Sequence, residues 1–205
     1  MRNTLMLLIG LGLCAVAGCA NPAPAMEQEP KSRLLISSGA APDKWTEPSA
    51  QPEPKTDTAA LERLVELRDQ AAAMPLRMPT ETMTRTLQQR VEVLFAARPS
   101  LTRLKSSGDP SMVVRGWHFE GSLAWDLAQA LRDSETPPGL TPEQIGIYRE
   151  AIDSKADELE ATASRSYGEC WSYVEACRGS GACALSEGAQ EAARICQTRG
   201  AEAAR

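Results

Sequence analysis

The sequence predicts an all-α domain of helical hairpins that follows a disordered, proline-rich linker. Only 4% of its 205 residues are aromatic, and β-branched residues are sparse beside Ala, Leu, Glu and Arg. That balance favours helix over strand. From about residue 57 onward, apolar residues recur every three to four positions, which places them on one face of a helix.

The first 19 residues have the pattern of an export signal. Arg2 supplies a positive charge, and residues 5–16 are mostly apolar. A stretch this short is typical of a signal peptide, because a bilayer span needs roughly 20 apolar residues. The run Val16-Ala17-Gly18-Cys19 resembles the lipobox of bacterial lipoproteins. The resemblance implies removal of residues 1–18 and acylation of Cys19, for example with palmitate.

The expected location is therefore the bacterial cell envelope, with the membrane bound through the acyl chains. One acyl chain anchors a protein only marginally, whereas the two or three that the resemblance implies hold it firmly. The formal net charge is -5, with no dense Lys/Arg stripe. That charge argues against a nucleic-acid partner. Ala20 stands where many inner-membrane lipoproteins have Asp, which favours the outer membrane, facing either the periplasm or the cell surface.

Residues 19–56 comprise the lipidated cysteine and a tether. Half of the 14 prolines in the chain lie in this segment. It cannot bury enough apolar surface to offset the entropy of ordering, and its prolines keep it extended. Leu34-Leu35-Ile36, with Trp45 downstream, is either incidental to the linker or a short docking segment for the helical domain or a partner.

The helical domain is expected over residues 57–205. The predicted helices of its first part, residues 57–135, are 57–74, 80–99, a short turn at 101–105, and 111–133. Thr80 is expected to cap the second helix, and Pro99 to end it. Gly116 and Gly121 either weaken the third helix by up to about 1 kcal/mol each or permit a neighbouring helix to approach closely.

The second part, residues 140–200, contains a long helix and a cysteine-rich hairpin. Thr141-Pro142-Glu143-Gln144 has the pattern of a capping box, with proline at the first helical position. No helix breaker follows until Gly168, so this helix is expected to continue to about Cys177. After a glycine-containing turn, Ser186 is expected to cap a last helix that runs through Cys196.

Four cysteines gather at the C-terminal end of the chain, and an even number in an exported segment indicates disulfides. Three pairings are possible. Cys170 and Cys177 are two helical turns apart and share a face. If the last two helices are antiparallel, Cys170 and Cys196 lie at similar height, which favours the nested pairing Cys170–Cys196 with Cys177–Cys183. The gaps of six, five and twelve residues do not suit zinc, whose ligands usually come as C-x2–4-C pairs.

No residue set predicts catalysis, a cofactor or a metal. The single histidine, His118, lies between Trp117 and Phe119 and is interpreted as a packed residue. No phosphate-binding glycine loop or nucleophile elbow is present. The carboxylates after residue 150 alternate with basic residues, as on a solvated helix face. They are Asp153, Asp157, Glu158 and Glu160.

The segment from about 113 to 177 resembles a recurring part of bacterial envelope proteins with tetratricopeptide repeats. The matching runs are Leu123-Ala124-Trp125-Asp126-Leu127-Ala128-Gln129-Ala130-Leu131, Pro137-Pro138-Gly139, Leu140-Thr141-Pro142-Glu143-Gln144 and Tyr148-Arg149-Glu150-Ala151. The resemblance implies helix hairpins that serve protein–protein contact. The sequence lacks a clean 34-residue period, so either a degenerate repeat domain or a helical bundle fits it.

Two functions follow from these observations. The first is a non-enzymatic lipoprotein that binds or scaffolds another envelope protein, a role that includes an accessory subunit or inhibitor of an enzyme. The second is a small-ligand-binding lipoprotein whose pocket is lined by Trp117, Trp125 and Trp171. Core packing is the alternative role of these tryptophans.

Overall fold

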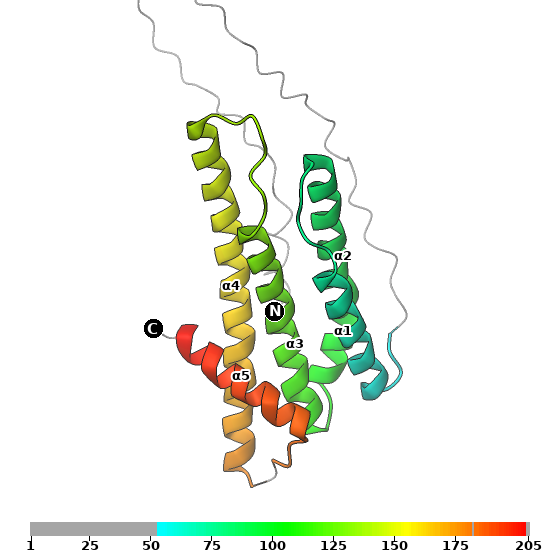
Figure 1. Cartoon of the computed structure of the whole chain (residues 1–205). Coiled ribbons are helices and arrows are strands. Elements are labelled where there is room, and N and C mark those ends of the chain that lie inside the picture. The colour runs from blue at the N-terminus through cyan, green and yellow to red at the C-terminus, as the bar shows by residue number, and fades with distance from the viewer. Residues whose placement is uncertain (1–52, 182, 204–205) are drawn as a thin grey trace, which may run out of the picture. The chain divides into compact units, whose positions relative to one another are not determined.

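The computed structural model of the chain describes residues 53–181 and 183–203, and this part is built from helices without strands (Figure 1). In chain order the helices are α1 (Asp57–Ala72), α2 (Thr80–Lys105), α3 (Pro110–Arg132), α4 (Pro142–Gly179) and α5 (Glu187–Ala203). The predicted all-α class is therefore confirmed. Cys19, Leu34-Leu35-Ile36, Trp45 and the tether up to residue 52 lie outside the described residues.

Helix α3 is central and packs against each of the other four helices. The remaining contacts pair α1 with α2 and α4 with α5. Helices α3 and α4 lie side by side in opposite directions, and α4 extends past the end of α3 (Figure 1). The second half of α4 is therefore packed between α3 and α5. The first half is buried only at Ala156 and Leu159, and its earlier turns project.

Polar side chains cap three of the helix starts. Thr56 Oγ1 accepts a hydrogen bond from the N–H three residues later at 3.1 Å, and Asp109 Oδ1 accepts one from the N–H two residues later at 2.8 Å. The predicted capping box is confirmed. Thr141 Oγ1 accepts from the Gln144 N–H at 3.3 Å, and Gln144 Oε1 accepts from the Thr141 N–H at 2.9 Å. These bonds satisfy backbone donors that the first helical turn leaves open.

The start of α2 differs from the prediction by one position. Pro79 occupies the cap position without a side-chain hydrogen bond, and Thr80 is the first helical residue. The Pro79 carbonyl accepts from the Met83 N–H at 3.0 Å, which begins the helical hydrogen bonding one residue early. Thr80 is therefore not the cap.

The end of α2 also differs, because Pro99 lies inside the helix and does not terminate it. The expected separate turn at 101–105 is the last part of α2. A proline in a helix interior removes a hydrogen bond and costs about 3 kcal/mol. Leu101 and Leu104 are buried in the core beyond it, and their packing offsets the local cost of the proline.

The core is made of three clusters of buried side chains. The first joins α1, α2 and α3 around Leu64, Leu67 and Leu104. The second, called here the stapled end, contains Val114, Ala124, Ala163, Tyr167, Cys170, Val174, Ala189, Ala192, Ala193 and Cys196. The third, called here the open end, contains Leu76, Leu127, Ala128, Leu131, Ala156 and Leu159.

The two α3 glycines lie where other helices approach closely. A Cβ atom on Gly121 would lie 2.8 Å from the Tyr167 ring, and one on Gly116 would lie 3.0 Å from Leu104 Cβ. Of the two roles that the sequence leaves open, close approach is therefore confirmed. The Gly121 contact allows α4 to pack against the middle of α3 at the stapled end.

Ion pairs fasten α4 to the end of α3. Arg132 lies 2.6 Å from Asp157, 3.0 Å from Glu160 and 3.6 Å from Asp153. Hydrogen bonds to Glu160 and then to Asp157 raise the pKa of Arg132 above its ordinary value. Asp153 and Asp157 remain mostly exposed, as on the solvated helix face that the sequence predicts, whereas Glu160 is partly buried; α3 supplies the cation that all three contact.

Candidate functional site

Both disulfides lie in the α4–α5 hairpin, in the nested arrangement that the spacing favours. Cys170 is bonded to Cys196, with 5.9 Å between the Cα atoms, and both residues are fully buried. Cys177 is bonded to Cys183, with a Cα separation of 5.0 Å, and both are partly exposed. The hairpin therefore has one bridge in its core and one at its tip.

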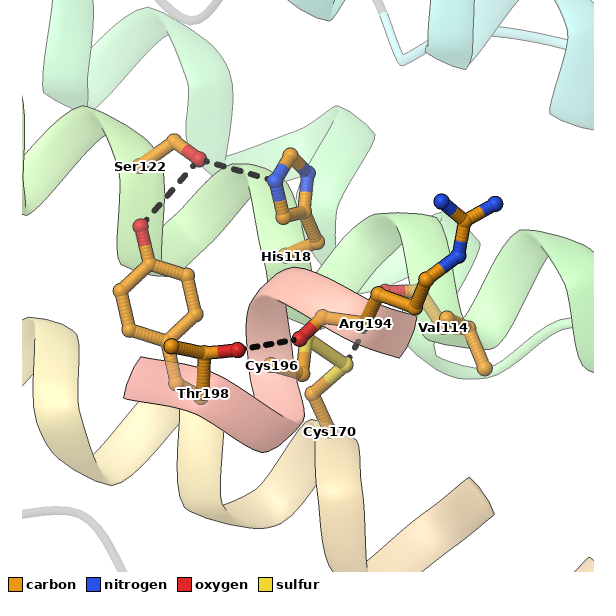
Figure 2. Close-up of a disulfide and its surroundings, with 8 residues drawn as sticks. Val114, His118, Ser122, Cys170, Arg194, Cys196 and Thr198 are labelled. Carbon is orange, nitrogen blue, oxygen red and sulfur yellow. Dashed lines mark hydrogen bonds between the residues drawn. A yellow bond between two sulfur atoms is a disulfide. The ribbon is translucent and has the colours of Figure 1, made fainter. Parts of the chain in front are cut away.

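The lone histidine is on α3, one helical turn after Val114, whose carbonyl contacts the inner disulfide (Figure 2). His118 Nε2 is 3.4 Å from Ser122 Oγ, and the Tyr167 hydroxyl donates to the same Ser122 oxygen at 3.4 Å. Burial, then the positive charges of Arg68 and Arg115, lower the pKa of His118 to about 4. The imidazole is therefore neutral at pH 7.

This arrangement resembles a serine–histidine pair only in distance. Within residues 53–181 and 183–203, no carboxylate makes a hydrogen bond to His118, so the group that orients the base in a triad is missing there. His118 instead packs edge-on to Phe119, with ring centroids 5.9 Å apart. The geometry matches the packed residue that the sequence predicts.

The three candidate tryptophans pack around the stapled end and carry cations on their rings. Each is partly buried, and its side chain contacts the buried residues of this cluster. The pairs are Lys105 on Trp117 at 4.3 Å, Arg199 on Trp125 at 4.1 Å and Arg178 on Trp171 at 5.6 Å from the ring centroid. None of the three lines the cleft described next. Their geometry favours the core-packing role over a ligand pocket.

A cleft of about 550 Å³ opens where the 73–79 loop meets α2 and the end of α3. Arg90 lines its wall and is only 8% exposed. Its Nε donates to the Met74 carbonyl at 2.6 Å, and its Nη1 donates to the Asp126 carbonyl at 3.4 Å. Burial lowers the pKa of Arg90, while the nearby Asp126 charge opposes that shift. This guanidinium therefore fastens the loop to α3.

The remaining wall of the cleft carries both signs of charge. Asp126, Asp133 and Glu135 supply carboxylates, and Arg77 supplies a second cation. Desolvation raises the pKa of Asp126, against the opposing charges of Arg68 and Arg90. Ala72, Pro75, Leu76 and Ala130 complete the lining with Gln129, so the cleft has both polar and apolar walls.

The projecting half of α4 exposes apolar surface. Ile147 is 63% exposed and Ile145 is 37% exposed, and Ala156 is the first buried residue of the helix. Tyr148 anchors the other side of this half, since its hydroxyl donates to the Glu135 carbonyl at 3.3 Å. The exposed side of α4 is therefore a helical surface that carries a large aliphatic side chain.

Sequence reasoning did not single out Arg90 or Ile147. Arg90 is three residues after Leu87 and four before Leu94, so it occupies a position of the buried stripe of α2. Ile145 and Ile147 are two apart and cannot share a helix face. Arg90 could have been identified as a charged residue at a buried-stripe position. Ile147 could have been identified as an apolar residue on a helix face other than the predicted buried one.

The described residues hold no group of three or more His, Cys, Asp or Glu side chains placed to bind a metal ion. Among the helices of the same residues, none is long and apolar enough to cross a bilayer. Comparison with protein-family models, with curated proteins and with solved structures finds no match. Function must therefore be argued from the chain itself.

Proposed function

We propose that this protein is a lipid-anchored, non-enzymatic lipoprotein of the bacterial envelope whose helical domain binds or scaffolds another envelope protein. The observation that carries the interaction role is Ile147, a large aliphatic residue that is 63% exposed on the projecting half of α4. Exposed aliphatic side chains on a helix are suited to contact with a partner protein. The resemblance to tetratricopeptide-repeat proteins places its helix-opening motif, Leu140-Thr141-Pro142-Glu143-Gln144, at the start of the same helix.

The proposed membrane location is based on the sequence. Val16-Ala17-Gly18-Cys19 supplies the acylation site, and the proline-rich segment after it is a spacer between the lipid and the helices. Ala20 favours the outer membrane. The expected partners are the bilayer, through the acyl chains, and an envelope protein, with no nucleic acid.

The anchor is tested by replacing Cys19 with alanine. The variant is expected to lose labelling with an acyl-chain probe and to leave the membrane fraction. Cys14→Ala is the matched control, because Cys14 lies inside the proposed signal and its loss is expected to change neither readout. Membrane retention of the Cys19→Ala chain would contradict the anchor.

The interaction surface is tested by photo-crosslinking. A photoreactive amino acid at Ile147 is expected to give a reproducible crosslinked protein in intact cells, since the exposed side chain would lie in the interface. The same probe at Ala161, an exposed residue farther along α4, is the control and is expected to give less product. No crosslink at residue 147, or equal products at both positions, would count against this surface.

The second candidate function is binding of a small polar ligand, and the cleft around Arg90 is the observation that favours it. Thermal-shift screening with small polar compounds, including amines and carboxylic acids, tests this function. Binding that is lost in the Asp126→Asn variant and kept in an Ile147→Glu variant would support the cleft. No stabilising compound would leave the protein-binding function as the better proposal.

A further inference from the structure

The two disulfides differ sharply in access to solvent. Cys170 and Cys196 are each 0% exposed, inside the stapled end (Figure 2). Cys170 Sγ lies 3.7 Å from the Val114 carbonyl of α3, so a third helix covers this bridge. Cys177 is in the last turns of α4 and Cys183 is in the loop before α5, and both are partly exposed.

We propose that Cys177–Cys183 is a thiol–disulfide exchange site, which reacts with dithiol reductants while Cys170–Cys196 remains closed and the helical domain remains folded. Exchange requires an approaching thiolate to reach a sulfur atom. The outer bridge is reached from solvent, whereas the inner bridge is reached only after α5 has separated from α3 and α4.

The hairpin does not depend on the outer bridge for its position. The Ser186 N–H donates to Ser111 Oγ of α3 at 2.9 Å, which fixes the start of α5. Leu185 packs against the stapled end just before the helix. Ala189 and Ala193 are buried in the same cluster. Opening of Cys177–Cys183 therefore releases the tip of the hairpin and leaves α5 attached.

The reaction is a two-electron reduction by a dithiol. Its thiolate attacks Sγ of Cys177, forms a mixed disulfide there and expels Cys183 as a thiolate, which takes a proton from water. The second thiol of the reductant then reacts as a thiolate. It attacks the reductant sulfur that is bonded to Cys177, which closes a disulfide within the reductant. The Cys177 thiolate leaves and takes up a proton from water. Cys177 lies at the carbonyl end of α4, where negative charge is disfavoured, so the first electron pair leaves on Cys183.

Differential alkylation tests the proposal on the full chain purified from membranes in detergent. The protein is titrated with dithiothreitol, quenched with an alkylating reagent and mapped by peptide mass spectrometry. Cys177 and Cys183 are expected to be labelled at least about tenfold faster than Cys170 and Cys196, because the inner pair requires local unfolding first. Far-UV circular dichroism is expected to stay constant while the outer pair is labelled.

The matched control is the double variant Cys177→Ser/Cys183→Ser. It is expected to keep its helical spectrum and to show no labelling at dithiothreitol concentrations that open the outer bridge of the natural chain. Equal labelling rates for the two pairs would overturn the proposal. Loss of helix during reduction of the outer pair, or rapid labelling of Cys170 in the control variant, would overturn it as well.

Discussion

The two halves of α4 are held in opposite ways. At the stapled end, small and aromatic side chains pack tightly against α3 and α5, and a buried disulfide ties α4 to α5. At the open end, Ala156 and Leu159 share an apolar cluster with α3 beside the ion pairs of Arg132, and no residue of α4 before Ala156 is buried. A single continuous helix therefore runs from a covalently closed core to a projecting surface.

The part of α4 that stabilises the fold is therefore different from the part that is exposed to a partner. Buried apolar contacts stabilise both ends of the domain, but only the stapled end adds a cross-link between α4 and α5. Exposed ion pairs contribute little, about 0–1 kcal/mol each. The turns of α4 before Ala156 then offer surface to a partner, while the buried clusters farther along hold the helix in position. The predictions below test this division.

The largest effect is expected from loss of the inner disulfide. Cys170→Ser/Cys196→Ser removes a bridge between residues 26 apart, worth about 3–4 kcal/mol in the chain-entropy model. The outer pair, 6 residues apart, is worth about 2 kcal/mol in the same model. Urea denaturation of both double variants measures the difference. Equal losses of unfolding free energy would contradict the division between core and tip.

The second prediction is that His118 makes the stability of the fold depend on pH. The pKa of His118 in the folded chain, about 4, lies below the value of 6.5 expected when it is unfolded. The unfolded chain therefore binds a proton first, so this contribution to stability is full above pH 6.5 and is lost as pH falls toward 4. The loss amounts to about 3 kcal/mol. The charges that face the ring are Arg68 from α1, Arg115 from α3 and Glu191 from α5.

Denaturant titrations of the natural chain and of His118→Gln between pH 7 and pH 4 measure this contribution. The variant is expected to have a smaller slope of stability against pH between 6.5 and 4. Carboxylates that titrate in the same range are common to both chains and cancel in the comparison. Parallel slopes would show that His118 is not held neutral by its surroundings.

A third prediction tests the close packing of α3 against α4. Gly121→Ala places a methyl group against the Tyr167 ring, and we expect a loss of about 1–3 kcal/mol from overpacking. Gly146→Ala in the projecting half of α4 is the control, since nothing lies within 4 Å of its Cβ position. There the better helix propensity of alanine is expected to stabilise the first turns of α4 locally, so no loss of global stability is expected. Thermal unfolding of both variants gives the comparison.

The smallest effect is expected from loss of the helix caps. The comparison depends on whether each loss lowers the stability of the whole domain or only of one helix end. Asp109→Ala and Thr141→Ala each remove a cap worth about 1 kcal/mol. The first turns of α3 are buried at Ser111 and Val113, so Asp109→Ala should lower the global unfolding free energy. Thr141→Ala should instead increase hydrogen exchange in the first turns of α4 alone. Equal global losses would place the open end within the same cooperative unit.

Much of the fold was predictable because helices leave local signals. The capping box at Thr141 is encoded within four consecutive residues, and the structure contains both of its hydrogen bonds. Pro99 shows where such local reading fails. The proline disfavours the helix locally. The helix nevertheless continues, because Leu101 and Leu104 pack against residues of α1 and α3 that are distant in the sequence.

The candidate site was less predictable than the fold. Nothing near Arg90 in the sequence indicates that its guanidinium bridges the carbonyls of Met74 and Asp126, 16 and 36 residues away. The exposure of Ile147 likewise depends on where α3 ends relative to α4. Both depend on the relative positions of helices, and the period of apolar residues carries no information about those positions.

The sequence by itself determined the helical class, most helix boundaries and the presence of a cysteine-rich hairpin, because propensity, periodicity and capping act over a few residues. The tertiary structure alone decided which disulfide is buried, why Gly121 is required against Tyr167, and which half of α4 remains exposed. These properties depend on what each helix packs against. Folding brings together residues that are distant in the sequence, and these neighbours determine which side chains are buried. The sequence of a single helix therefore does not predict its burial.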